Sequence, residues 1–99
     1  MHIFMRIMPT MRFTWHEPKR LGNIRKHGLD FVDAESVFNG PTSTVEDKDD
    51  HRGEQRFNTS GLLDAAVVVM THTESDDEIH IISMRKADNH ETREFFSLL

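Results

Sequence analysis

The side chains that could do chemistry in this 99-residue chain are cations and histidines scattered along its length. They are Lys26, His27, Arg56, His72, Arg85 and Arg93. Cleavage of RNA without a metal ion needs such a set. A base takes the proton from the ribose 2′-hydroxyl, that oxygen attacks the adjacent phosphorus, cations stabilise the phosphorane, and an acid protonates the leaving 5′-oxygen. Histidine can take either proton-transfer role near neutral pH. Composition alone does not single out this chemistry among the functions of small domains.

Other chemistries have less support in the sequence. His16-Glu17 is followed by Pro18, which breaks the HExxH spacing of zinc proteases. The chain has no Gly-x-Ser-x-Gly turn, no glycine-rich phosphate loop and no cysteine. The groups Asp49-Asp50-His51 and Asp76-Asp77-Glu78 could bind a hard cation, but acidic runs in loops are usually just solvated. We therefore expect no functional metal and no cofactor.

Arg85 lies near the end of the stretch around which the chain is organised. Residues 65–87 contain two apolar runs on either side of the charged segment 74–78, which predicts a β-hairpin. By the two-residue period of a strand, Ile79, Ile81, Ser83 and Arg85 share one face. An arginine at a strand end suits a phosphate, because its fork of donors matches phosphate oxygens. The alternative is a surface ion pair with a neighbouring carboxylate.

Weaker patterns predict the elements that surround this hairpin. Pro18 is typical of a helix start and Gly28 of a helix end. Asp30 can cap a second helix, and Asp88 with Glu91 three positions later forms a capping box for a third. The expected elements in order are strand 11–15, helix 18–27, a helix from Asp30, strands 42–45 and 54–61, the hairpin, and a helix from Asp88.

This order predicts an α+β domain with a short N-terminal strand, two helices, an antiparallel sheet of three to four strands and a C-terminal helix. We expect residues 11–99 to form the single domain and residues 1–10 a loose extension, with the native start near Met11. The absence of cysteine fits a reducing cytoplasm. No apolar run reaches the length that crosses a bilayer, so we expect no membrane partner.

The formal net charge of -5 argues superficially against a nucleic-acid partner. Eight acids, however, lie in two expected loops, Glu46 to Asp50 and Glu74 to Glu78. Without these eight acids and Lys48, 11 of the 12 basic and 9 of the 17 acidic residues remain. The body of the domain is therefore near neutral, and overall charge leaves the partner open.

A set of spaced motifs resembles the BrnT family over residues 11 to 96. The motifs are Trp15-His16-Glu17-Pro18-Lys19, Asn23, Lys26 to Phe31, Ala34 to Phe38, Glu54 to Phe57, Gly61, Ile81 to Ala87, Glu91 and Arg93. The resemblance implies a compact RelE-like fold and a cytoplasmic ribonuclease toxin of a type II toxin–antitoxin pair, which inhibits translation and growth. It also implies a BrnA-like antitoxin partner with a ribbon–helix–helix domain. Contact with operator DNA would then run only through the antitoxin, in a heterotetramer of the two proteins.

The resemblance also assigns roles to residues. His27, Glu54, Arg56 and Arg85 are the implied catalytic residues, with His27 and Glu54 as proton-transfer candidates and the arginines on phosphate. Implied RNA contacts are Lys26, Arg93 and Phe95. His72 is a further candidate RNA contact, selected from its residue type and not from the resemblance. Phe95 stands where the family usually has Tyr, so only stacking on RNA remains there. His27 could instead only cap its helix, and His72 could be structural.

Two functions remain open from the sequence. The first is a metal-independent endoribonuclease that cleaves RNA by 2′-hydroxyl attack. The second is a non-catalytic interaction module that binds a ribbon–helix–helix antitoxin and tunes transcriptional repression. The missing Tyr and the acidic loops favour the module, whereas Arg56, Arg85 and Lys26-His27 favour the enzyme.

Overall fold

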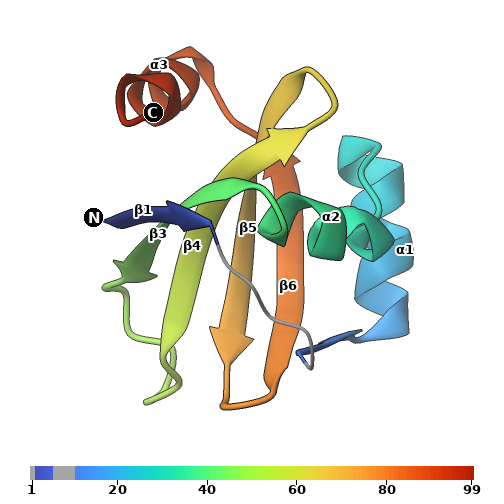
Figure 1. Ribbon diagram of the computed structural model, residues 1–99. Coiled ribbons are helices and arrows are strands. Elements are labelled where there is room, and N and C mark those ends of the chain that lie inside the picture. The colour runs from blue at the N-terminus through green and yellow to red at the C-terminus, as the bar shows by residue number, and fades with distance from the viewer. Residues whose placement is uncertain (1, 6–10) are drawn as a thin grey trace.

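The computed structural model describes residues 2–5 and 11–99, with side chains from residue 11 onward. These residues form one mixed sheet with helices packed around it (Figure 1). The strands are β1 His2–Met5, β2 Arg12–Trp15, β3 Pro41–Asp47, β4 Arg56–Leu63, β5 Ala66–Glu74 and β6 Glu78–Lys86. The helices are α1 Glu17–His27, α2 Ala34–Phe38 and α3 Asn89–Ser97, with a 3-10 turn, η1, at Phe31–Asp33. The α+β class and the central hairpin are therefore confirmed.

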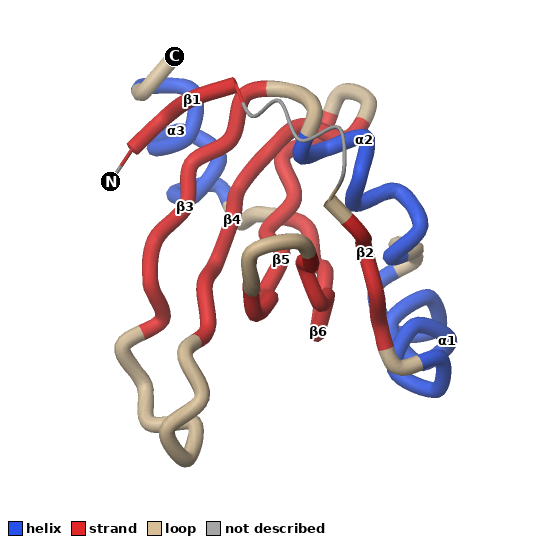
Figure 2. The backbone as a smooth tube through the Cα atoms, turned by 60° about the horizontal axis from the view of Figure 1, so that its bottom comes forward, coloured by secondary structure: helices blue, strands red, loops and turns tan. Residues whose placement is uncertain are grey.

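The sheet has six strands in the order β1-β3-β4-β5-β6-β2, so the expectation of three to four antiparallel strands is wrong. The strand β2 pairs in parallel with the first half of β6, where Thr14 lies opposite His80. The strand β1 pairs antiparallel with β3, so the described part of the expected loose extension, residues 2–5, is an edge strand. Residues 1 and 6–10 of that extension lie outside the described residues. Figure 2 shows β1 and β2 at opposite edges of the sheet.

One face of the sheet carries the hydrophobic core. The fully buried side chains there include Phe31, Val37, Phe38, Val68, Met70, Ile79, Ile81 and Met84. Gly61 of β4 allows α2 to approach, because a Cβ at this position would lie 2.5 Å from Val37 Cγ1. The preceding residue, Ser60, lines a cavity beneath α3. Since successive strand residues point to opposite faces, α2 and α3 cover opposite faces of the sheet.

The face opposite the core carries polar side chains of β4, β5 and β6 together with apolar ones such as Val67 and Val69. It carries Arg56, Asn58 and Ser60 of β4, Thr71 and Thr73 of β5, and His80, Ser83 and Arg85 of β6. We call this set of residues the polar face. The helix α3 lies over one part of it, at Ser60 and Arg85, where the cavity beneath that helix is found. Arg56 and His80 lie toward the other end.

A β-bulge in β6 decides which residues reach the polar face. Thr71 pairs with Ser83 and the next residue, His72, pairs with Ile81, so Ile82 has no partner on β5. Such an extra residue reverses the alternation of side chains along its strand.

The reversal corrects the face predicted for β6. Ile79 and Ile81 face the core before the bulge, and Met84 faces the core after it. The prediction that Ile79, Ile81, Ser83 and Arg85 share one face is therefore wrong. Ser83 and Arg85 lie with His80 on the polar face.

The helix α1 lies along the edge of β6 beyond β2. The amide of buried Asn23 donates to the carbonyls of Met84 at 2.8 Å and Leu29 at 3.0 Å, and the Met84 N–H donates to Asn23 Oδ1 at 3.1 Å. This side chain therefore completes the hydrogen bonds of β6 where no strand lies beside it. The helix ends at Gly28 with φ of 70°, as predicted.

The other predicted helix caps are also confirmed. Asp30 accepts a hydrogen bond from Val32 N–H at the start of η1, and the Arg20 guanidinium that donates to it lowers the pKa of its carboxyl. Asp88 and Glu91 form the full capping box of α3. None of the helices in the described part of the chain is long and apolar enough to span a bilayer.

Candidate functional site

The predicted site residues lie at two ends of the sheet. Glu54 and Arg56 are at the start of β4, where Arg56 is opposite Asp47 of β3. Arg85 is opposite Val69, which is itself opposite Ser60, four residues beyond Arg56 on β4. At about 3.3 Å per residue and about 4.8 Å between strands, the two arginine Cα atoms are about 16 Å apart. Both arginines belong to the polar face, but in different parts of it.

Arg56 is paired with the glutamate that the sequence associates with it. Arg56 Nε donates to Glu54 Oε1 at 2.9 Å, and the arginine side chain is 29% exposed. Its two terminal nitrogens have no hydrogen-bond partner within the described residues. Beside it on the polar face, Thr71 Oγ1 donates to Asn58 Oδ1 at 2.7 Å. Arg56 can therefore offer its outer donors to an anion while Glu54 orients it.

Arg85 is held by a carboxylate of α3. Its Nη1 and Nη2 atoms donate to the two Glu91 oxygens at 2.8 and 2.9 Å. Glu91 also accepts from the Asp88 N–H at 2.9 Å. The hydrogen bonds from Arg85, and then that from Asp88, lower the pKa of Glu91 to about 2. The pair borders a cavity of about 320 Å³ beneath α3, whose walls include Asn58, Ser60 and Phe95. Of the two readings of Arg85, the ion pair is the one present in this arrangement.

His72 lies on the core face. It is fully buried, 2.7 Å from Thr59 Oγ1 through Nε2. Its ring contacts Phe38 edge-on at 5.3 Å and stacks on Phe57 at 6.0 Å between centroids. A surface ligand cannot reach this ring without a rearrangement of the core.

The remaining predicted residues lie on helices. Lys26 is exposed and His27 half-buried in the last turn of α1. On α3, Arg93 is exposed, whereas Phe95 is 2% exposed and forms part of the cavity wall. Stacking of Phe95 on RNA therefore requires that α3 moves away from the sheet.

A further histidine, which the sequence analysis did not select, lies on the polar face. Nδ1 of half-buried His80 is 2.8 Å from Thr14 Oγ1, and that hydroxyl donates to Glu78 Oε2 at 2.5 Å. Continuing the β4–β5 register by one residue places Arg56 beside Thr73, which pairs with His80. Only the parallel pairing of β2 with β6 brings Thr14 to this position. Because no short-range pattern in the sequence predicts that pairing, nothing in the sequence marks His80.

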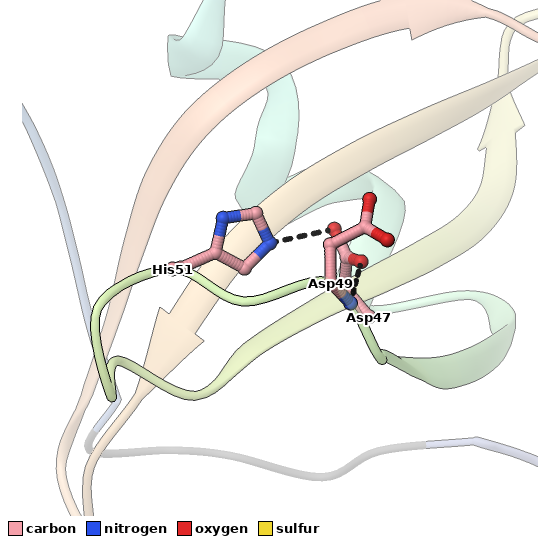
Figure 3. A group of neighbouring side chains, drawn as sticks. All are labelled: Asp47, Asp49 and His51. Atoms are coloured by element: carbon pink, nitrogen blue, oxygen red, sulfur yellow. Dashed lines mark hydrogen bonds and ion pairs between the residues drawn. The ribbon is translucent and has the colours of Figure 1, made fainter.

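The end of β3 and the loop that follows it contain a group of three side chains that could hold a metal. One ligand atom from each of Asp47, Asp49 and His51 lies within 4.8 Å of the others (Figure 3). In this arrangement Asp47 accepts from the Asp49 N–H at 3.1 Å and lies 3.2 Å from His51 Nε2. The Asp49 N–H is the main cause of the lowered pKa of Asp47. These contacts among the three residues hold them close together as part of the loop's own structure.

Comparison with known families agrees with the resemblance seen in the motifs. The family model described as ribonuclease toxin, BrnT, of type II toxin-antitoxin system matches residues 15–91. A search of curated proteins gave no match. The matched range includes Arg56, His80 and Arg85 and ends before Arg93 and Phe95. Because it covers most of the sequence, the chain belongs to the BrnT family of ribonuclease toxins of type II toxin–antitoxin systems.

Proposed function

We propose that this protein is a metal-independent endoribonuclease that cleaves RNA by attack of a 2′-hydroxyl on the adjacent phosphate. Its cleavage of RNA would inhibit translation and growth. We propose further that it acts in the cytoplasm, in a fold of the RelE type, and is neutralised by a BrnA-like antitoxin with a ribbon–helix–helix domain. The antitoxin would carry any contact with operator DNA, in a heterotetramer.

The observation that carries this proposal is the Arg56–Glu54 pair at the start of β4. A guanidinium with free outer donors can hold a phosphate, and the carboxylate beside it is a candidate for one of the two proton transfers. The hydroxyls and amide of Thr71, Thr73 and Asn58 extend this polar surface along the sheet. A single strand of RNA could therefore lie along the polar face with its backbone at Arg56.

The other candidate residues would act around this centre. Arg85 would bind a different phosphate from Arg56, because the two Cα atoms are about 16 Å apart. Lys26 and Arg93 would contact the RNA backbone from the two helices. His27 is a candidate for proton transfer at the end of α1, and His72 and Phe95 would contact RNA only after a rearrangement.

The second candidate function is the non-catalytic module that binds an antitoxin. One observation favours this function: Glu91 accepts hydrogen bonds from both terminal nitrogens of Arg85. A guanidinium in a bidentate pair has fewer donors left for phosphate.

Cleavage of a defined RNA by the purified protein in excess chelator tests the proposal. We expect products with 2′,3′-cyclic phosphate and 5′-hydroxyl ends. Arg56→Ala should lower the rate about 100-fold, because a donor to the phosphorane is lost. Arg56→Lys keeps the positive charge but lacks the forked donors of the guanidinium. Its cleavage rate should lie between those of wild type and Arg56→Ala. Lys19→Ala removes an exposed cation of α1 to which no role is assigned and should leave the rate unchanged.

Two results would contradict the proposal. If chelator abolishes cleavage and Asp49→Asn does the same, the acidic loop holds a required metal. If folded wild-type protein cleaves no RNA but binds a ribbon–helix–helix antitoxin, the interaction module is the better description.

A further inference from the structure

We propose that His80 is the base that accepts the 2′-hydroxyl proton, and that Thr14 and Glu78 position it. This inference rests on the proposed ribonuclease function. It adds to that function the contact between His80 of β6 and Thr14 of β2, two strands far apart in the sequence. It follows from hydrogen bonding on the polar face.

The hydrogen bonds around Thr14 determine which nitrogen of His80 carries a proton. A threonine hydroxyl has one proton, and Thr14 donates it to Glu78 Oε2. The same oxygen lies 2.8 Å from His80 Nδ1, so toward the histidine it can only accept. In neutral His80 the hydrogen is therefore on Nδ1, and Nε2 has the free lone pair. This is the tautomer that a base acting through Nε2 requires.

The carboxylate at the end of this chain of hydrogen bonds is itself held in place. Glu78 Oε1 lies 3.3 Å from Arg12 Nη2, while Oε2 accepts from Thr14. When Nε2 takes a proton, the imidazolium formed keeps its Nδ1–H on the Thr14 oxygen and lies close to the Glu78 charge. The arrangement thus orients the ring and stabilises the state that follows proton transfer.

The position of His80 relative to Arg56 suits the reaction. Thr73 lies between them on β5, so two strand spacings, about 10 Å, separate their Cα atoms. A phosphate bound above Thr73 would have the guanidinium on one side and the imidazole on the other. Nε2 of His80 has no hydrogen-bond partner within the described residues, and the ring is half-buried.

The step balances with the groups named. The His80 Nε2 lone pair takes the proton of the 2′-hydroxyl, and the oxygen forms a bond to phosphorus. The bond from phosphorus to the 5′-oxygen breaks, and that oxygen takes a proton from a water molecule. The imidazolium then releases its proton to water, which restores the base.

The first test is cleavage by variants of His80. We expect His80→Ala to cleave at least 100-fold more slowly than wild type, with binding of a 2′-O-methyl RNA unchanged and with partial rescue by added imidazole. His90→Ala removes an exposed histidine of α3 and should match wild type in both assays. If His80→Ala does not fold, His80→Gln takes its place. A variant that folds and cleaves like wild type would overturn the inference and leave the ribonuclease function intact.

The second test is the tautomer, which needs no catalysis. In ¹⁵N NMR spectra of imidazole nitrogens, neutral His80 should carry its hydrogen on Nδ1. Thr14→Val should lose this preference and slow cleavage without weakening RNA binding, which a purely structural threonine would not do. A hydrogen on Nε2 in wild type would overturn the inference. Failure of wild type to cleave any RNA would instead remove the proposed function, and is seen before any variant is made.

Discussion

Glu91 shows how much one side chain can do at the junction of sheet and helix. It completes the capping box of α3, and it neutralises Arg85 of β6 through two hydrogen bonds. Both interactions need its ionised form, which is why its pKa falls to about 2 from the usual 4.5. The stabilisation is present above the unfolded-state pKa and is lost as pH falls from about 4.5 toward 2.

Glu91→Gln should therefore lower the free energy of unfolding at pH 7 by about 1–2 kcal/mol, since solvent reaches the pair and weakens it. Urea denaturation of both proteins from pH 7 to pH 3 measures this difference, which should narrow as pH falls below 4.5. Glu94→Gln, on the same helix in an exposed pair with His90, should change stability by less than about 0.5 kcal/mol. A difference between Glu91→Gln and wild type that persists unchanged to pH 3 would contradict the assignment.

Two glycines provide a second comparison of single residues. A Cβ at Gly61 would lie 2.5 Å from Val37 Cγ1, in the contact between β4 and α2. Gly61→Ala should destabilise the fold by about 1–3 kcal/mol, because the core has to shift to accept it. At Gly22 of α1 the nearest atom is 3.8 Å away, and Gly22→Ala should stabilise by about 0.5–1 kcal/mol. Thermal denaturation of the two variants should therefore shift in opposite directions.

At the scale of elements, the sequence predicted the helix ends and the hairpin, which depend on interactions between residues close together in the chain. Gly28 ends α1 and Asp88 caps α3 as predicted, because both devices depend on neighbouring residues only. The β5–β6 hairpin follows from its apolar runs in the same way. The bulge at Ile82 could not be predicted, because the two-residue period assumes a regular ladder and gives no sign of an extra residue.

The candidate site was predicted in part for the same reason. Arg56 and Glu54 are two residues apart, and they do form a pair. His80 depends on Thr14, 66 positions away, through a parallel pairing that has no short-range signature. Arg85 was expected on a phosphate, with a surface ion pair as the alternative, and its partner is Glu91, which the sequence marked as a helix cap and as part of the family motifs.

The attachment of α1 to β6 leads to a prediction at this scale. Removing the Asn23 amide would leave buried carbonyls of Leu29 and Met84 and the Met84 N–H without a partner. Asn23→Ala should cost about 2–4 kcal/mol of stability and increase amide hydrogen exchange at the end of β6. Asn89→Ala, at an exposed position of α3, should cost less than about 0.5 kcal/mol. Equal stabilities of the two variants would show that the amide does not hold α1 on the sheet.

At the scale of the whole molecule, charge is distributed unevenly. The acidic β3–β4 loop and β5–β6 turn adjoin the end of the sheet that carries Arg56 and His80 (Figure 1). Residues 46–50 and 74–78, which lie in these two connections and in the strand ends beside them, contain eight of the 17 acidic residues. Their field should repel the RNA backbone from the surface proposed to bind it, to an extent that salt reduces.

Neutralising part of this field should strengthen RNA binding. We expect the double variant Asp49→Asn, Asp76→Asn to bind 2′-O-methyl RNA about 2- to 5-fold more tightly at about 50 mM salt, with the gain lost near about 0.5 M. The double variant Asp33→Asn, Glu35→Gln makes the same charge change at exposed positions of η1 and α2, on the core side. If the location of the charge matters, this second variant should bind RNA with the affinity of wild type. If only net charge matters, it should bind RNA as tightly as the first variant.

The parallel pairing of β2 with β6 also has a consequence in time. During synthesis Thr14 leaves the ribosome before Glu78 and His80, which follow it in the sequence by 64 and 66 residues. The pairing joins residues 12–15 to residues 78–81, so this edge of the sheet can close only after residue 81 has left the ribosome. A nascent chain would therefore have no positioned His80 until β6 has emerged and paired with β2, and the proposed nuclease would become competent only then.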